Sequence, residues 1–331
     1  MTRRLIALTA GLLLVTLFSI GGTASAAGGP ILPGSAYGPE GATAPGSADR
    51  YVTLFAGRRP LVARVRQDGG QVLRARSFGR LAIPAVTLDG SAGGLSADGS
   101  TLVLTPLRSG LRRAETTLKV IDARRLHVRD RITLDGSFTF DAISPDGSAI
   151  YLVEYLSRTD PTRYEVRAYD LRAGHLLSKP IVDPNEPPGE MRGYPITRAV
   201  SPAGRWAYTL YDGGGDHPFI HALDTVGRRA VCIDIHALAD HPALRNVFAG
   251  NARRFGLAVS DNGGEVTVLD RDVPVAYVDT QSFEVSEPTA PANGGGFPWV
   301  LVILAAAAFI AAVLTLGLRR RRHDVAAGGA R

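Results

Sequence analysis

The pattern of apolar and polar positions repeats four times along the chain. Each copy is an apolar run, a turn of the Ser-Pro-Asp-Gly type and a second apolar run, at residues 95–104, 143–152, 200–208 and, more weakly, 259–263. The turn serines are separated by 48, 57 and 59 residues. In such turns proline presets one backbone angle, aspartate or asparagine bonds its own backbone, and glycine accepts a positive φ. Each copy therefore predicts a β-hairpin with a tight turn.

A second marker follows every turn, namely an alternating strand that ends in aspartate. These aspartates lie 26, 26, 23 and 19 residues after the turn serines, at Asp122, Asp170, Asp224 and Asp279. A further strand comes next, as at residues 127–132 or 230–235. Four strands in a unit of roughly 40 to 60 residues are typical of a β-propeller blade. We interpret the recurring carboxylates, with Asp98 and Asp146 in the turns, as turn formers and not as catalytic groups.

The stretch before the first copy predicts an incomplete blade. It contains three apolar runs, at residues 51–55, 61–66 and 71–77. The fourth strand is expected from the other end of the chain, near residues 283–285, because a closed ring buries every blade face. The fold class predicted is all-β, a propeller of four-stranded antiparallel blades. Five blades are expected, or six or seven if degenerate copies exist, and only residues 234–244 suit a short helix.

The N-terminus predicts export. Arg3 and Arg4 precede an apolar run at residues 5–20, and a small-residue cleavage pattern ends at Ala26. This arrangement is typical of a cleaved signal peptide. An uncleaved N-terminal anchor is the alternative interpretation.

The C-terminus predicts a membrane anchor. Residues 299–318 carry no charge, and as a helix they would be about 30 Å long, the thickness of a bilayer core. Four arginines at residues 319–322 follow directly and are expected to hold that end in the cytoplasm. The chain is therefore predicted to be a single-pass type I protein of the cell membrane, with its N-terminal part extracytoplasmic.

The termini and the repeats together divide the chain into six predicted parts. These are a signal peptide, a flexible lead-in, a propeller ectodomain, a Pro/Gly-rich stalk, a transmembrane helix and a basic cytoplasmic tail, at residues 1–26, 27–49, 50–285, 286–298, 299–318 and 319–331.

The net charge of +6 lies at the termini. Residues 27–298 hold 30 basic and 30 acidic side chains, so nucleic acid is not a predicted partner. Within this part, residues 50–131 carry 16 basic and 6 acidic residues, whereas residues 132–298 carry 14 and 22. A basic arc could rest against anionic lipid or a cell-wall polymer, although arginines scattered on solvated strand faces would give the same count.

The repeats resemble a known group of propellers. Turns such as Ser144-Pro145-Asp146-Gly147, followed by a strand ending as in Leu223-Asp224-Thr225, are similar to the YVTN-type and WD-like repeats of bacterial exported proteins. With the signal peptide and the anchor, the chain resembles membrane-anchored propeller proteins of high-GC Gram-positive bacteria. This resemblance implies the fold over about residues 49–287 and implies no particular function, because propellers carry many activities.

Two segments are weak candidates for metal binding. Asp212 and Asp216 flank a glycine-rich hairpin that could hold Ca²⁺, although a plain hairpin explains the glycines equally well. His236, Asp240 and His241 are close in sequence, but zinc usually needs a third protein ligand and an open position. Exposed loop histidines are the alternative. No other cofactor is predicted.

The long connection at residues 183–194 is the first choice for a recognition surface, because ligand contacts accumulate on such loops. Its candidate binding residues are Glu186, Glu190, Arg192 and Tyr194. An insertion without a role in binding is the alternative. The only cysteine, Cys232, is expected to be a small buried hydrophobe. The chain contains no Gly-x-Ser-x-Gly elbow and no phosphate-binding loop.

These features favour a binding or scaffold module for a protein, peptide or cell-wall ligand. No catalytic residue is predicted. The alternative is a metal-dependent hydrolase or lactonase-like enzyme that uses the propeller channel.

Overall fold

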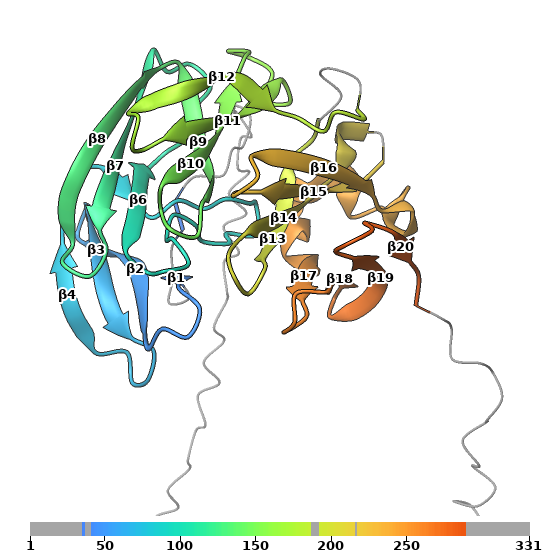
Figure 1. The fold of residues 1–331 in the computed structure, drawn as a ribbon, viewed down its shortest axis with the longest axis horizontal. Coiled ribbons are helices and arrows are strands. Elements are labelled where there is room, and N and C mark those ends of the chain that lie inside the picture. The colour runs from blue at the N-terminus through green and yellow to red at the C-terminus, as the bar shows by residue number, and fades with distance from the viewer. Residues whose placement is uncertain (1–34, 37–40, 187–191, 216, 289–331) are drawn as a thin grey trace, which may run out of the picture. The chain divides into compact units, whose positions relative to one another are not determined.

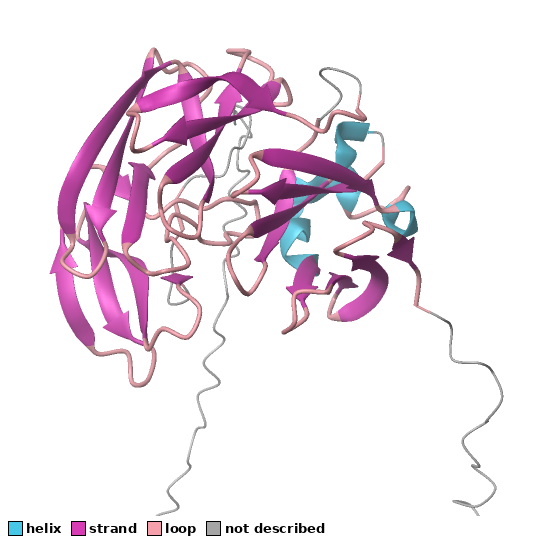
Figure 2. Ribbon diagram, in the orientation of Figure 1, coloured by secondary structure: helices cyan, strands magenta, loops and turns pink. Residues whose placement is uncertain are grey.

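The alternating apolar runs form β-strands, and the Ser-Pro-Asp-Gly segments form the tight turns between them. A computed structural model describes residues 35–36, 41–186, 192–215 and 217–288. Strands dominate these residues, and short 3₁₀ turns occur only around the last two sheets (Figure 2).

Twenty strands form five antiparallel sheets of four strands each. Sheet 1 contains β1 to β4, at Ala42–Thr43, Asp49–Ala56, Arg59–Arg66 and Val72–Arg76. Sheet 2 contains β5 to β8, at Leu81–Ala82, Thr101–Pro106, Glu115–Asp122 and His127–Asp135. Sheet 3 contains β9 to β12, at Ser137–Ile143, Ala149–Tyr155, Tyr164–Asp170 and His175–Ile181. Sheet 4 contains β13 to β16, at Pro195–Val200, Trp206–Tyr211, Phe219–Asp224 and Arg229–Asp234. Sheet 5 contains β17 to β20, at Phe255–Val259, Glu265–Asp270, Val273–Asp279 and Val285–Ser286.

In every sheet the strands pair in the order of the sequence, so each sheet is an up-and-down meander. This is the architecture of a propeller blade, and the prediction of an all-β propeller with five blades is confirmed. In Figure 1, β4 and β8 lie at the periphery, while β1 and β13 lie toward the centre.

The predicted closure of the ring is wrong. We expected residues 283–285 to complete the first sheet, but β20 pairs with β19 of its own sheet. The fourth strand of sheet 1 is β1, which pairs Ala42 with Tyr51. Sheet 1 therefore begins inside the segment that the sequence suggested was a flexible lead-in, because a two-residue strand gives almost no periodic signal.

Four 3₁₀ turns are present: η1 at Gly213–Gly215, η2 at His236–Leu238, η3 at Leu244–Ala249 and η4 at Asn251–Arg254. Thus the stretch suited to a short helix, residues 234–244, contains only η2 and the start of η3. None of the helical turns among the described residues is long and apolar enough to span a membrane. The predicted signal peptide and the predicted span lie outside these residues.

Buried apolar side chains join neighbouring sheets. One cluster contains Val62 of sheet 1 and Leu102 of sheet 2, and another contains Val103 of sheet 2 and Ile150 of sheet 3. Further clusters join sheets 3 and 4, and sheets 4 and 5. Within the described ranges, no apolar cluster joins sheets 5 and 1. The core is therefore a series of layers between successive blades.

The tight turns contact each other around one side of the molecule, which we call the turn side. The backbone N–H of Asp98 donates to the carbonyl of Pro145, 3.0 Å away in the next turn. Sheet 1 has its own turn at residues 44–47, where the N–H of Ser47 donates to the carbonyl of Ala44 at 3.1 Å. The opposite side, which carries the β2–β3, β6–β7 and β10–β11 connections, is the loop side.

A glycine at such a junction should be sensitive to substitution. Gly147 has φ +67°, and a Cβ there would lie 2.5 Å from Oγ1 of Thr101 in the neighbouring sheet. Gly174 has φ +73° with open space around it. We expect Gly174→Ala to lower the free energy of unfolding by about 1 kcal/mol, through backbone strain alone. Gly147→Ala should lower it by about 3 kcal/mol, because overpacking adds to the strain. Urea unfolding of the full chain measures both, and equal losses would contradict the stacking of the turns.

Candidate functional site: an axial cavity and a buried ion pair

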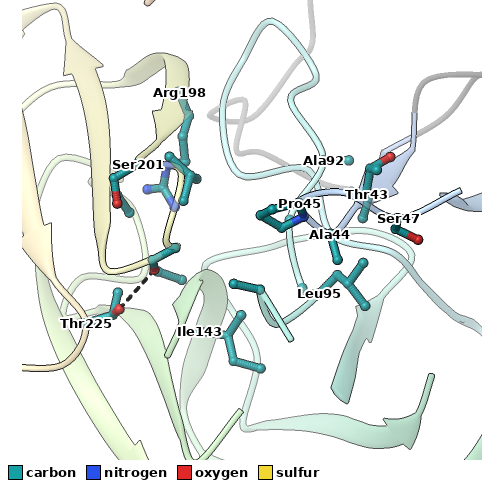
Figure 3. A pocket seen from close by; sticks show the side chains of 18 of the residues that line it. Thr43, Ala44, Pro45, Ser47, Ala92, Leu95, Ile143, Arg198, Ser201 and Thr225 are labelled. Atoms are coloured by element: carbon teal, nitrogen blue, oxygen red, sulfur yellow. Dashed lines mark hydrogen bonds between the residues drawn. The ribbon is translucent and has the colours of Figure 1, made fainter. Parts of the chain in front are cut away.

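An axial cavity of about 540 Å³ lies between the inner strands of sheets 1 to 4. Its walls come from β1 and the turn after it, from the segment before β6, and from β9 and β13. In Figure 3, Arg198 and Ser201 lie across the cavity from Thr43, Ala44 and Pro45. Because turn residues from three sheets line it, the cavity opens at the turn side.

Small residues make up most of the cavity wall. The alanines are Ala42, Ala44, Ala92, Ala97, Ala142 and Ala207, and five glycines accompany them. Serine and threonine hydroxyls add a few polar groups. Of the described residues in the lining, only Asp141 and Arg198 are charged.

Asp141 owes its position to a break in the strand register. In β9, Ala142 pairs with Tyr151 and Phe140 pairs with Leu152, so Asp141 is the extra residue of a β-bulge. A bulge turns a side chain out of the regular alternation. It brings this carboxylate to the cavity wall from within an otherwise apolar strand.

Arg198 of β13 pairs with Asp141 across the junction between sheets 3 and 4. Its guanidinium donates to both the main-chain carbonyl and Oδ1 of Asp141, and its Nε donates to Oγ1 of Thr209 at 2.8 Å. The two charged side chains are only 7% and 3% exposed. Oδ2 of Asp141 is buried and has no hydrogen-bond partner among the described residues. The cavity wall thus holds a neutralised ion pair with one unused acceptor.

Arg198 begins a row of polar side chains across sheet 4. The register pairs Arg198 with Thr209, Thr209 with His221, and His221 with Cys232. Directly paired residues of antiparallel strands project from the same face of the sheet. Because Arg198 binds Asp141 of β9, this row faces sheet 3.

His221 is a buried neutral imidazole. It is 1% exposed, and neither ring nitrogen has a hydrogen-bond partner among the described residues. Burial lowers the pKa of His221 to about 4; Arg198 adds to this effect, and Asp141 opposes it. The ring is therefore uncharged at neutral pH, since an imidazolium here would be desolvated and close to a guanidinium.

Cys232 does not form a reactive pair with His221. Its backbone N–H donates to Oδ2 of Asp183 at 2.8 Å. Burial raises the pKa of the Cys232 thiol to about 12, and the carboxylates of Asp183 and Glu186 add to this effect. The thiolate is the nucleophilic form of cysteine, so this thiol is unreactive at neutral pH.

Three tyrosines pack beside the row on the loop side. The ring centroids of Tyr155 and Tyr164, and of Tyr164 and Tyr211, are 6.2 Å apart. Burial raises the pKa of Tyr155 to about 12 and raises that of Tyr211 further. A second cavity of about 20 Å³ lies here, and it shares Phe140 and Asp141 with the axial cavity. These two residues therefore separate the axial cavity from the tyrosine cluster.

The candidate Ca²⁺ hairpin is built around Asp212. Its Oδ1 accepts hydrogen bonds from the backbone N–H groups of Tyr194 at 2.7 Å and Gly214 at 3.1 Å. Burial raises the pKa of Asp212. The carboxylate thus stabilises the hairpin and the neighbouring chain. Asp216 lies outside the described residues.

The three residues near η2 diverge. The His236 ring packs on that of His217, with centroids 5.8 Å apart. The Asp240 carboxylate pairs with Arg245 at 3.0 Å. Nε2 of His241 lies 3.3 Å from Arg254, which holds Asp270 in an ion pair. In the part of the chain that the structure describes, no three His, Cys, Asp or Glu side chains are grouped to hold a metal.

The candidate recognition loop lies between β12 and β13. Glu186 and Arg192 are exposed, whereas Tyr194 is partly buried against the core of sheets 4 and 5. Glu190 lies outside the described residues. Glu186, Arg192 and Tyr194 do not line the axial cavity.

Asp141, Arg198 and His221 were not predicted as site residues. Each lies inside a strand. A charged or imidazole side chain within an apolar run could have indicated these residues, because such groups are buried only when they serve a structural or chemical role. Their convergence depends on strand register, which periodicity alone does not specify.

Comparisons with known proteins give only distant structural similarities. No protein-family model and no curated protein matches the chain. Among solved structures, TolB from Acinetobacter baumannii is similar with a TM-score of 0.43 and 15% identity, over 74% of this chain and 52% of that one. The β-propeller domain of Cps50 (Swd1) from Myceliophteria thermophila is similar with a TM-score of 0.43 and 8% identity, over 79% and 69%. The dihydro-heme d1 dehydrogenase NirN has a TM-score of 0.44 and 13% identity, over 76% and 46%. The chain thus spans about half the length of the TolB it matches.

The buried ion pair gives a test of the site's construction. We expect Arg198→Met to lower the free energy of unfolding by about 3–5 kcal/mol, because it leaves the Asp141 carboxylate buried without a partner. The double variant Asp141→Leu/Arg198→Met should lose less than this single variant, since no buried charge remains. Urea unfolding of the full chain compares the two. A larger loss in the double variant would show that the pair is not coupled as described.

His221 should make stability depend on pH. Its folded pKa is about 4, below the ordinary value of 6.5. As pH falls from 6.5 toward 4, the unfolded chain binds a proton that the folded chain does not, so stability decreases by about 3 kcal/mol. His221→Leu should remove this part of the slope, whereas His127→Gln, at an exposed position, should retain it. Unfolding free energies at pH 7 and pH 4.5 measure the difference.

Proposed function

We propose that this protein is a membrane-anchored extracytoplasmic propeller that binds an uncharged, extended polypeptide segment in its axial cavity. The export and anchoring part of the proposal comes from the signal-like N-terminus and the apolar C-terminal stretch. The binding part rests on one observation, which is the chemistry of the cavity wall.

The wall favours an uncharged guest. Its two charged side chains, Asp141 and Arg198, neutralise each other, and the guanidinium donors are used within the protein. A charged group entering the cavity would lose its hydration without gaining an opposite charge. A hydroxyl or an amide N–H could instead donate to the unused Oδ2 of Asp141.

The inner strands suit an extended chain. The strands β1, β9 and β13 are each the edge of a sheet, and each contributes residues to the cavity wall. The protein already uses one of these edges, since the N–H groups of Leu88 and Asp89 donate to the carbonyls of Pro195 and Ile196 at 2.9 and 3.1 Å. A guest segment would add to the continuation of β13 at residues 198–200 in the same manner, which is a common mode of peptide recognition.

Phage-displayed random peptides, selected against the full chain in detergent, test the proposal. Selected peptides should be poor in Asp, Glu, Lys and Arg. Val200→Arg should reduce their binding at least tenfold, because Val200 lines the cavity and is 51% exposed. Val273→Arg is the matched control, since Val273 is 61% exposed on sheet 5 and is not part of the lining. Equal loss with both variants, or a selection rich in charged residues, would refute the assignment.

Metal analysis distinguishes this proposal from the hydrolase hypothesis. The full chain, purified with Ca²⁺ and Zn²⁺ present and then dialysed, should retain neither at one equivalent. If the chain instead retained one equivalent of metal and the Asp141→Asn variant lost it, the metal would lie at the cavity wall. That result would overturn the binding role proposed here.

A further inference from the structure

Exposed arginines gather on the loop side of sheets 1 and 2, away from the mouth of the cavity. Arg58 lies in the β2–β3 turn and Arg59 is the first residue of β3. The β4–β5 connection carries Arg80, and the β6–β7 connection carries Arg108 and Arg112. All five side chains are exposed, and within the described ranges none forms an ion pair. We call these five residues the basic loop surface.

Contacts between the connections hold the basic loop surface together. The backbone N–H of Leu107 donates to the carbonyl of Arg80 at 2.9 Å, so the β4–β5 and β6–β7 connections touch. The N–H of Ile83 donates to Oγ1 of Thr53 at 3.2 Å, which fixes the start of sheet 2 against β2. These hydrogen bonds hold the connections of sheet 2 next to each other and next to β2.

Apolar side chains lie next to the same arginines. Leu54 and Phe55, at the end of β2 beside the β2–β3 turn, are 39% and 47% exposed. Large apolar groups beside cationic groups on one protruding hairpin are typical of surfaces that enter a lipid interface.

Carboxylates offset only part of this charge. Glu115 and Asp135 are exposed and oppose each other across β7 and β8 at the same end of sheet 2. Two carboxylates against five guanidinium groups leave an excess of three positive charges on this surface.

We propose that the basic loop surface docks on an anionic lipid bilayer. Guanidinium groups near an anionic membrane are attracted to it within a Debye length. A soluble polyanion would satisfy the arginines but would leave Leu54 and Phe55 in water, so a bilayer is the partner that uses both kinds of side chain. Because the axial cavity opens at the turn side, docking in this orientation directs its mouth away from the bilayer.

Hydrogen exchange of the full chain in lipid nanodiscs tests this inference. Residues 54–59 and 107–112 should exchange more slowly in discs of mixed phosphatidylcholine and phosphatidylglycerol than in discs of phosphatidylcholine alone. The triple variant Arg58→Ser/Arg59→Ser/Arg112→Ser should reduce this protection at least about tenfold, since each arginine contributes to attraction at the surface. Raising NaCl to about 0.5 M should weaken it as well, through screening.

A matched variant removes the same charge from the turn side. Arg124, Arg125 and Arg172 are exposed there, and their triple substitution by serine should leave the lipid-dependent protection unchanged. Leu54→Ser should weaken protection without altering its salt dependence. Equal exchange in both kinds of disc would overturn the inference. Stronger protection by soluble polyphosphate than by anionic discs would also overturn it, in favour of a polymeric partner.

Discussion

The structure depends on the need of each four-stranded sheet to cover two apolar faces. A single blade cannot do so, and successive blades must therefore pack face to face. Clusters between sheets 1 and 2, 2 and 3, 3 and 4, and 4 and 5 cover the faces that meet at these four junctions. Close packing of successive sheets also limits the residues of the tight turns. At Gly147, a Cβ atom would collide with Thr101 of the preceding sheet.

The junction between sheets 3 and 4 departs from this apolar packing, because it buries the Asp141–Arg198 ion pair. That departure makes it the candidate site. Burying Asp141 and Arg198 costs solvation that their mutual attraction only partly returns. A neutral His221, whose ring nitrogens have no hydrogen-bond partner in the described part of the chain, adds to the cost. Sites that store such unfavourable energy within an otherwise consistent fold are commonly functional. The bulge in β9 is a second departure from regular structure at this junction. A regular strand would not bring the Asp141 carboxylate to the cavity.

Sequence reasoning succeeded where the signal is local. The repeated turns, with their Pro, Asp and Gly positions, predicted hairpins, four-stranded units and the number of sheets. The turn at residues 44–47 escaped notice because Pro45-Gly46 forms it without an aspartate. The ion pair escaped because Arg198 and Asp141 are 57 residues apart and meet only through the packing of two sheets. Spacing along the chain carries no information about such a contact.

The two sides of the propeller differ in chemistry, and this difference limits how it can act. The turn side contains a cavity whose charges cancel, while the loop side of sheets 1 and 2 has an excess of arginine. A tether alone would leave the ectodomain free to rotate above a membrane. An electrostatic contact on the loop side would restrict that rotation and keep the cavity open to the exterior. In the arrangement that we propose, the basic loop surface would orient the protein and the neutral axial cavity would bind the guest.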